Sequence, residues 1–481
     1  MPWEGLRNAF AFSAAAPQPA PLPNSLYHPG NLPQSEDCLT LNVWTNAAEA
    51  SERRPVMVWF HLGAFVFGAS SGTTGPGGRI LFDGAALAEL GPIVVTVNYR
   101  LGRLGFLAHP WLTEESAHGS SGNYGFLDQV AALQWVKDNI AGFGGDPENV
   151  TIFGVSAGSA SCSLHMVSPL SKGLFHKVVA SSGGFMGKAS RHSGLFDRLL
   201  TLAAAETRGC EVTDALSVRT LDDLRGLPLE AIATAAISTE AGPWMMDPLG
   251  MCIGEGASDT CYPIIDGYAL PDDPSAIFRE GRHNDVPLLT GSTLDDASGL
   301  AGIETLESFV QYLQGDMGAL AEQALAAYCE GGRVPPFRAS GNLLADRVFG
   351  WQNWTWARLA KQYGSQPVYY YEWTQDLPIP SNRYAERRLG AVHGAEMPFM
   401  FRNLDAYDWP WADSDHRLAE IVSRYWVNFA TTGDPNGDGL PKWPSLGDEQ
   451  GPALQLQHVP YISLPQRRQR FAILDRYYSA I

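Results

Sequence analysis

Three short, continuously apolar segments constrain the fold of this chain more than any other feature. They are Val56–Phe60 (VMVWF), Ile93–Val97 (IVVTV) and Val150–Gly154 (VTIFG). Their β-branched and aromatic residues favour strands, and a strand that is apolar at nearly every position is buried on both faces. Because helical segments lie between these runs, the pattern predicts an α/β fold, a mostly parallel sheet with helices on both faces.

The helix before the third run is predicted by its apolar spacing. In the segment FLDQVAALQWVKDNI, apolar residues recur every three or four positions. This spacing places them on one face of an amphipathic helix. The residues are Phe126, Val130, Leu133, Val136 and Ile140.

The remaining elements fit one large domain over residues 1–481. Shorter apolar runs predict further strands at Leu39–Trp44, Val178–Ala180, Leu288–Leu289 and Val368–Tyr371, and a helix at Leu418–Phe429. Two stretches, at about residues 193–274 and 300–358, are more helical and have less strand character. We interpret them as helical insertions that form the wall of a pocket rather than as separate domains.

The charge of the chain argues against nucleic acid as a partner. The 51 acidic and 33 basic residues give a formal net charge of −18, and such a surface repels phosphate backbones. No apolar run reaches the roughly 20 residues that span a bilayer. The N-terminal segment lacks the basic region and unbroken apolar core of a secretory signal. We therefore expect a cytoplasmic protein without a membrane span.

The six cysteines do not predict a metal site. They include no CxxC pair and no spacing that is typical of zinc ligands. Cys252 and Cys261 could bridge a short loop, but spacing alone does not establish the geometry of a disulfide. We expect neither a metal ion nor a cofactor.

The pattern that points to chemistry is GVSAG at residues 154–158, directly after the strand VTIF and before the helical segment SASCSLHMV. A sharp turn from strand to helix holds the central serine in a strained conformation, and small flanking residues let the backbone pass closely. The hydroxyl group of Ser156 then projects beside a helix N-terminus, which favours developing negative charge. This context predicts Ser156 as a catalytic nucleophile.

A serine nucleophile needs a base and an orienting carboxylate, and here the expected chain order is serine, acid, histidine. Of the 11 histidines, His393 follows a predicted strand and lies in a glycine-containing loop, so it is a candidate base. The buried strand at Val286–Gly291 runs into Asp295 and Asp296. Either carboxylate could orient the imidazole, and the chemistry alone does not choose between them.

Backbone donors for a tetrahedral oxyanion are predicted after the strand VMVWF. The segment His61–Phe65 (HLGAF) is similar to the glycine-rich oxyanion loop of lipases and esterases. Gly63 and Ala64 can present N–H groups there, with Ala157 as the third donor. Each such donor contributes roughly 2.7–4 kcal/mol to transition-state stabilisation.

Several long segments resemble the type-B carboxylesterases, the family that includes the cholinesterases. They follow the order of the family from Ser35 nearly to the C-terminus, and include SEDCLTLNVW, PVMVWFHLGAF, IVVTVNYRLGRLGFL, FGGDPENVTIFGVSAGSAS, HGAEMPFMF and YWVNFATTGDPNGDGLPKWP. The resemblance implies the α/β-hydrolase fold and hydrolysis of carboxylic esters, without a cofactor, through an acyl-enzyme on serine.

The resemblance also implies roles for particular residues. Ser156 is the nucleophile and His393 the base, and Asp296 is the orienting acid, at a position where most members of the family have Glu. The further matches are Gly63, Ala64 and Ala157 as oxyanion donors, Ser182 and Glu396 as polar groups behind the triad, and Arg100 with Asp128 as a buried ion pair.

Three departures from the family pattern lead to further expectations. Leu62 replaces the first glycine of the oxyanion loop, and we expect it to alter the shape of the pocket more than catalysis. Val155 stands beside the nucleophile where cholinesterases have Glu, which favours neutral esters over quaternary ammonium substrates. The chain also begins late relative to the family, near Pro2–Gly5, which predicts an unpaired edge of the sheet.

The predicted partners are a small-molecule ester and water. Two alternatives remain open, namely a catalytically silent binding or adhesion protein with the same fold, and an amidase or lactonase with the same triad. Labelling by a fluorophosphonate probe distinguishes the first alternative, and matched ester and amide substrates distinguish the second. Leaving-group preference depends on pocket shape, which the sequence does not reveal.

Overall fold

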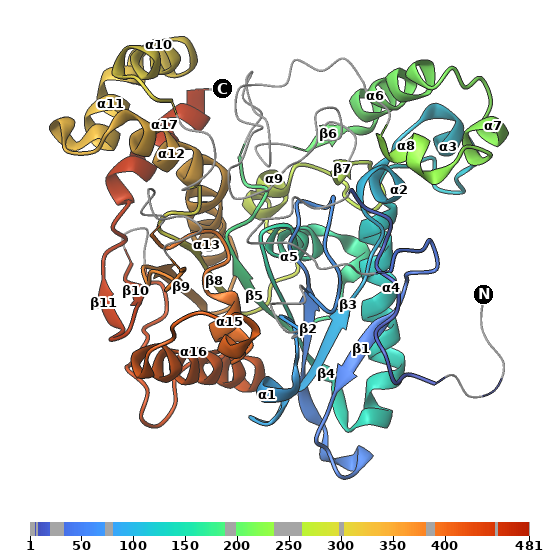
Figure 1. Cartoon of the computed structure of the whole chain (residues 1–481), viewed down its shortest axis with the longest axis horizontal. Coiled ribbons are helices and arrows are strands. Elements are labelled where there is room, and N and C mark those ends of the chain that lie inside the picture. Colours follow the sequence, from blue (N-terminus) through green and yellow to red (C-terminus); the bar gives the residue numbers. More distant parts are fainter. Residues whose placement is uncertain are drawn as a thin grey trace.

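A nine-stranded sheet forms the centre of the molecule (Figure 1). The computed structural model describes residues 5, 8–19, 33–72, 80–187, 199–234, 262–297, 303–380, 390–447 and 451–480. Within them the strand order is β1-β3-β2-β4-β5-β8-β9-β10-β11, and only the pairs β1–β3 and β10–β11 are antiparallel. The strands are β1 (Leu41–Trp44), β2 (Arg54–Phe60), β3 (Ile93–Val97), β4 (Gly145–Val155), β5 (Lys177–Ser181), β8 (Leu288–Thr293), β9 (Val368–Trp373), β10 (Ala453–Leu456) and β11 (Tyr461–Ser463).

The apolar runs are strands that are buried on both faces, as their composition predicts. In β2, the side chains of Val56, Val58 and Phe60 belong to the core cluster on one face of the sheet. Met57 and Trp59 belong to the cluster on the opposite face, and all five side chains are fully buried. Burial on both faces is the reason that this strand does not alternate between apolar and polar residues.

Every strand predicted from the sequence is present; β3 has the predicted bounds, and the other strands begin or end at different residues. β1 begins at Leu41 rather than Leu39, and β4 begins at Gly145 rather than Val150. The sequence did not predict β10 and β11, which contain four and three residues. Such short segments carry too few residues for a periodic pattern, and their place in the sheet depends on the distant strand β9.

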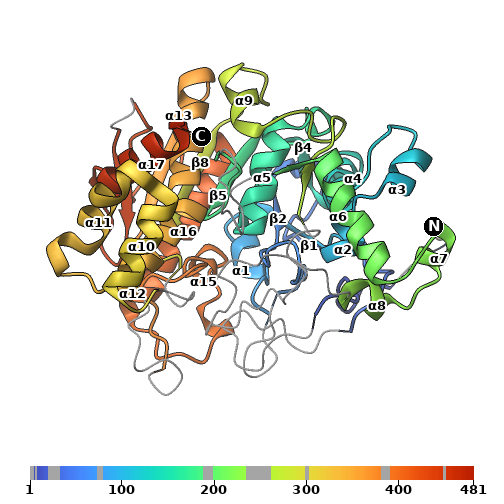
Figure 2. The same ribbon diagram turned by 90° about the horizontal axis from the view of Figure 1, so that it is seen from above.

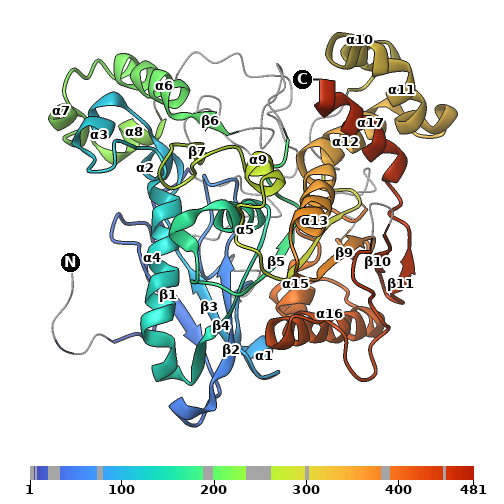
Figure 3. The same ribbon diagram turned by 180° about the vertical axis from the view of Figure 1, so that it is seen from behind.

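Helices cover both faces of the sheet. The core cluster on one face includes residues of α4 (Tyr124–Asn139), α5 (Ala157–Val167) and α13 (Trp351–Tyr363), which lie across the sheet in Figure 3. The cluster on the other face includes residues of α15 (Met397–Met400) and α16 (Asp413–Thr432). Figure 2 shows α5 and α13 on the opposite side of the sheet from α15. This layering confirms the predicted α/β fold.

The buried face of α4 differs from the predicted one by one residue. Phe126, Leu133 and Val136 are buried as expected, whereas Val130 is only partly buried. The side chain buried at this turn is Gln129, whose amide nitrogen donates a hydrogen bond to Ser161 of α5 at 3.0 Å. The hydrogen bond from the amide nitrogen offsets part of the cost of burying this polar residue.

Most of the remaining helices form two groups at opposite upper corners of Figure 1, beyond the carboxyl ends of the central strands. One group contains α3, α6, α7 and α8, and the other contains α10, α11, α12 and α17. The first predicted insertion is not wholly helical, since it includes the short parallel strands β6 and β7. The bounds are α1 (Ala85–Ala88), α2 (Gly102–Phe106), α3 (Pro110–Glu115), α6 (Leu202–Ala215), α7 (Leu221–Arg225), α8 (Leu229–Thr234), α9 (Pro274–Arg279), α10 (Leu306–Met317), α11 (Ala321–Cys329), α12 (Pro336–Ala345), α17 (Arg468–Ala480), β6 (Leu200–Thr201) and β7 (Ile264–Ile265).

Other expectations are tested only in part. No helix in the described part of the chain is both long enough and apolar enough to cross a membrane. Within the described residues, β1 is the outermost strand on its side of the sheet. The predicted pair Cys252 and Cys261, and the segment Pro2–Glu4, lie outside the described residues.

Candidate active site

Ser156 lies at the turn from β4 to α5, as the GVSAG pattern predicts. Its backbone has φ 59° and ψ −122°, a conformation that residues with a side chain rarely adopt. The N–H of Ser156 donates to the carbonyl of Ser181 (2.9 Å), and its own carbonyl accepts from the N–H of Ala160 (2.8 Å). Hydrogen bonds on both sides of the serine therefore hold the strained turn in place.

The glycines of this pattern are required by close backbone packing. A Cβ atom at Gly158 would lie 1.9 Å from the carbonyl oxygen of Phe60, and one at Gly154 would lie 2.4 Å from the carbonyl carbon of Gly158. The start of α5 is therefore in backbone contact with the end of β2. Since β2 continues directly into the HLGAF loop, this contact brings Ser156 and the candidate oxyanion donors together.

His393 is paired with Asp296 and not with Asp295. Its Nδ1 lies 2.8 Å from Oδ1 of Asp296, and the two side chains are 2% and 0% exposed. Asp296 follows β8, which is separated from β4 only by β5, so Ser156 and Asp296 lie at the same edge of the sheet. An imidazole that donates its Nδ1–H to a carboxylate is held in the tautomer whose Nε2 can accept a proton.

Ser182 holds the other oxygen of Asp296. The Ser182 hydroxyl donates to Oδ2 at 2.9 Å and accepts from the N–H of Thr293 at 3.2 Å. With φ 52°, Ser182 adopts the left-handed conformation that is uncommon outside glycine. Both oxygens of the buried carboxylate thus have a donor, which offsets the cost of removing the charge from water.

Glu396 is a further buried carboxyl group near this pair. The hydroxyl group of Ser181 donates to its Oε1. Burial raises the pKa of Glu396 from 4.5 to about 7, the hydrogen bond from Ser181 opposes this increase, and the charge of Asp296 adds to it. The structure places Ser182 against the carboxylate of Asp296 and Glu396 against Ser181, and a pKa near 7 lets Glu396 exchange its proton close to neutral pH.

The HLGAF loop has an unusual backbone at three consecutive residues. The φ angles are 121° at Gly63, 53° at Ala64 and 61° at Phe65. The carbonyl oxygen of Gly63 accepts hydrogen bonds from the N–H groups of Val66 (2.8 Å) and Phe67 (3.0 Å). These bonds close a tight turn at the end of β2, beside the first residues of α5.

The residues that precede this turn are anchored in the core. Leu62 is 7% exposed and belongs to the same buried cluster as Trp59, on the face of the sheet opposite to α5. The ring of His61 stacks on Tyr99 with centroids 4.3 Å apart, and the Tyr99 hydroxyl donates to the His61 carbonyl at 2.9 Å. Burial lowers the pKa of His61 to about 4, so its imidazole is neutral at physiological pH.

The predicted ion pair between Arg100 and Asp128 is present, but it is not fully buried. Nε and Nη2 of Arg100 each lie 2.8 Å from the carboxylate of Asp128, which also accepts the backbone N–H of Arg100 at 3.0 Å. The Arg100 side chain is 37% exposed and that of Asp128 7%. The guanidinium lies over the ring of Tyr124 (5.4 Å) and is otherwise partly open to solvent. The pair joins the segment after β3 to α4.

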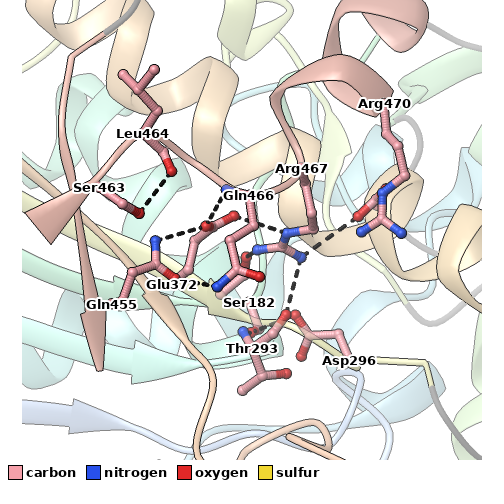
Figure 4. Close-up of polar contacts among 12 residues, drawn as sticks. Ser182, Thr293, Asp296, Glu372, Gln455, Ser463, Leu464, Gln466, Arg467 and Arg470 are labelled. Carbon is pink, nitrogen blue, oxygen red and sulfur yellow. Dashed lines mark hydrogen bonds and ion pairs between the residues drawn. The ribbon is translucent and has the colours of Figure 1, made fainter. Parts of the chain in front are cut away.

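An arginine that the sequence did not single out attaches the C-terminal segment to the strand that leads to Asp296 (Figure 4). Arg467 is 1% exposed. It donates to the carbonyl oxygen of Thr293 at 3.0 Å and to the hydroxyl group of Ser292 at 2.6 Å. These two hydrogen bonds fix the end of β8.

The charge of this arginine is balanced within a buried cluster. Arg467 pairs with Glu372 of β9 at 3.1 Å, and Gln455 of β10 donates to the same carboxylate at 2.9 Å. Arg470 pairs with Asp346 at 2.9 Å. Two cations and two anions therefore offset one another, which is the condition under which charges persist in a protein interior.

Sequence reasoning also missed Phe349. Its ring stacks on the imidazole of His393, with centroids 4.3 Å apart and an interplanar angle of 29°. Phe349 lies in a π-helical turn, Asp346–Gly350, between α12 and α13. Such turns are frequent at functional sites, but no local sequence pattern predicts them.

In the described part of the chain, no group of three His, Cys, Asp or Glu side chains is arranged to hold a metal ion.

Comparison with known proteins adds an independent line of evidence. The model described as "Carboxylesterase family" matches residues 1–473. The chain belongs to the carboxylesterase family. This carboxylesterase is a carboxylic ester hydrolase that acts on small ester substrates with water, and the type-B resemblance read from its motifs is confirmed.

Relatives and solved structures agree with this assignment. The carboxylesterase is 33% identical over 463 residues to the para-nitrobenzyl esterase of Bacillus subtilis (strain 168). The match covers 93% of this chain and 84% of that protein. It is 33% identical to the fumonisin B1 esterase of Sphingopyxis macrogoltabida, over 85% and 71% of the two chains. A solved PNB esterase matches 98% of this chain and 90% of its own, with a TM-score of 0.76 and 30% identity. A Geobacillus stearothermophilus carboxylesterase has the same coverage and identity and a TM-score of 0.75. The fold is therefore the α/β-hydrolase fold.

Proposed function

We propose that Ser156, His393 and Asp296 are the catalytic triad of this carboxylesterase. The observation that carries the proposal is the hydrogen bond of 2.8 Å between His393 Nδ1 and Asp296 Oδ1, at the sheet edge where Ser156 occupies its strained turn. This contact supports Asp296 as the acid, since the shorter side chain reaches the imidazole although most of the family has Glu there.

The three residues divide the reaction between them. The Ser156 hydroxyl oxygen attacks the ester carbonyl carbon while His393 Nε2 takes its proton, and Asp296 stabilises the imidazolium that forms. When the ester C–O bond breaks, His393 gives this proton to the departing alcohol and the acyl group stays on Ser156. Water then attacks the acyl carbon with His393 as the base. The carboxylic acid leaves, and the proton returns to Ser156.

Gly63, Ala64 and Ala157 are the proposed oxyanion donors. The left-handed turn of the HLGAF loop and the close contact between α5 and β2 support this assignment. Their N–H groups bind the negative oxygen of each tetrahedral intermediate, a charge that develops only on the way to the transition state. Fixed donors of this kind raise kcat because they do not have to reorganise during the reaction.

Neutral esters are the proposed substrate class. Val155, next to the nucleophile, is fully buried in the cluster on the α16 face and brings no charge to the site. Two relatives are named for para-nitrobenzyl and fumonisin B1 esters, which makes aryl-containing and bulky esters useful first substrates.

The remaining expectations are part of the same proposal. The chain is a single domain whose helical insertions, at about residues 193–274 and 300–358, form the pocket wall. Ser182 and Glu396 support the triad, and the pair of Arg100 and Asp128 is structural.

A cytoplasmic location is supported by the free thiols of the described cysteines, and the net charge of −18 argues against nucleic acid as a partner. The free thiols are Cys38, Cys162, Cys210 and Cys329.

Burst-phase hydrolysis of a short p-nitrophenyl ester tests the triad. Wild-type protein should release a burst of p-nitrophenol equal to the enzyme concentration, and Ser156→Ala should show no burst and a kcat lower by more than about 10⁴-fold. A fluorophosphonate probe should label only the wild type. A burst that persists in Ser156→Ala would refute the proposed nucleophile, and folded wild-type protein that shows neither burst nor labelling would point to a silent binding protein.

A further inference from the structure

Two adjacent acids at the end of β8 turn to different partners. Asp296 faces His393, as described above. The carboxylate of Asp295 instead accepts the backbone N–H of Ala391 at 3.0 Å and pairs with Arg338 of α12 at 2.6 Å. The backbone N–H of Asp295 also donates to the carbonyl oxygen of Ala391 at 3.1 Å. Asp295 therefore holds both polar groups of a residue that lies two positions before His393.

The loop that carries His393 is shaped to accept this carboxylate. Gly390 has φ 70°, and a Cβ atom there would lie 2.1 Å from Oδ2 of Asp295. The close approach and the left-handed backbone both require glycine at this position. The carbonyl of Gly390 accepts the N–H of Val392 at 3.0 Å, so the tethered segment forms a compact turn directly before His393.

The contact is built as a partly buried ion pair. The side chain of Asp295 is 13% exposed and that of Arg338 is 32% exposed. Burial raises the pKa of Asp295, while the charge of Arg338 and the N–H of Ala391 oppose this increase. The carboxylate thus depends on both partners, and through Arg338 it connects the histidine loop to α12 of the second insertion.

We propose that Asp295 is a positioning residue that ties the loop carrying His393 to the turn carrying Asp296, and so keeps the two triad members at hydrogen-bonding distance from each other. This inference rests on the triad proposed above. The histidine and its acid come from separate segments, and without the carboxylate of Asp295 only the backbone bond from Asp295 to Ala391 and the hydrogen bond between Asp296 and His393 would join these two segments directly. Because proton transfer depends steeply on geometry, a displacement of about 1 Å costs on the order of 10²-fold in rate.

Variants of the tether give a graded test. Asp295→Ala removes the carboxylate, and we expect kcat to fall roughly 10- to 100-fold with KM within about threefold of wild type. Asp295→Asn keeps one carbonyl oxygen for the N–H of Ala391, and it should restore most of the lost kcat. Arg338→Met leaves the contact between Asp295 and Ala391 in place and removes the ion pair that connects Asp295 to α12, so kcat should fall by a smaller factor of about 3 to 10.

Asp475→Ala is the matched control. The carboxylate of Asp475 also accepts from one arginine, Arg358 at 2.6 Å, and from one further N–H, that of Trp351 at 2.8 Å. This change should lower the melting temperature as Asp295→Ala does, but it should leave kcat within about twofold of wild type, because its partners lie on α13 and not in a loop that carries a triad residue.

All variants are assayed for kcat, KM and fluorophosphonate labelling rate at a temperature where each is folded by circular dichroism. The proposed role of Asp295 would be refuted by a kcat for Asp295→Ala within threefold of wild type. An equal loss of kcat in Asp475→Ala would refute it as well. If Asp295→Ala does not fold, the test rests on Arg338→Met, and a kcat for that variant equal to the wild-type value would refute the proposed role of Asp295. The burst of Ser156→Ala is measured in parallel, since a burst retained there refutes the triad itself and not merely its positioning.

Discussion

At the scale of single residues, the protonation of Glu396 links the active site to stability. Burial raises the pKa of its carboxyl group to about 7, with the hydroxyl group of Ser181 opposing and the charge of Asp296 adding to the increase. The folded chain therefore binds this proton more tightly than the unfolded chain does. The stability that follows is complete below the ordinary pKa of 4.5, falls as pH rises toward 7, and is lost above it.

Glu396→Gln should remove this dependence on pH. The amide stays neutral and can still accept from Ser181, so the variant avoids a buried charge beside Asp296. We expect its melting temperature to rise relative to wild type between pH 5 and pH 8, corresponding to at most about 3 kcal/mol. Thermal unfolding of both proteins across this range measures the difference. A difference that does not change with pH would show that Glu396 keeps one protonation state throughout.

At the scale of elements, the N-terminal segment contacts the chain just after the proposed oxyanion loop. The side-chain amide of Gln18 pairs with the backbone of Gly68, accepting its N–H at 2.8 Å and donating to its carbonyl at 2.9 Å. Gln18 is itself held by Gln34, whose Oε1 accepts its backbone N–H at 2.9 Å. A segment distant in sequence therefore holds Gly68, three residues beyond the HLGAF turn.

Gln18→Ala should loosen this loop and lower kcat. Because the donors are displaced rather than deleted, we expect about a tenfold decrease, less than the 10²- to 10³-fold loss of a whole donor. Gln134→Ala is the control, since Gln134 is exposed on α4, where its side-chain amide donates a hydrogen bond to Asp138 at 2.9 Å. Steady-state kinetics with one p-nitrophenyl ester compare the variants. Equal kcat values would mean that the loop keeps its shape without Gln18.

These elements also show how far the sequence determines the site. Apolar runs and local turns predict the central strands, α4, α5 and Ser156, because each depends on neighbouring residues along the chain. Asp296 and His393 could be placed in strand-end loops, but choosing between Asp295 and Asp296 needed the family resemblance. Gln18 and Phe349 could not be predicted, since their roles arise from contacts between segments that are far apart in sequence.

At the scale of the whole molecule, the excess of acidic residues creates a long-range field around the protein. The formal net charge is −18 at pH 7. A field of one sign changes how often charged substrates reach a site, and it acts on association more than on the chemical step. Salt controls its reach, because the screening length falls from about 30 Å at 0.01 M to about 3 Å at 1 M ionic strength.

Salt should therefore separate esters by their charge. Between 0.01 M and 1 M NaCl, we expect kcat/KM to rise several-fold for an anionic aryl ester and to fall several-fold for a cationic one of matched size. A neutral ester is the control, since it has no net charge for the field to act on, and its change isolates other effects of salt on the enzyme. Parallel slopes for all three esters would mean that the acidic residues lie too far from the entrance to influence substrate, and that the pocket wall alone selects among esters.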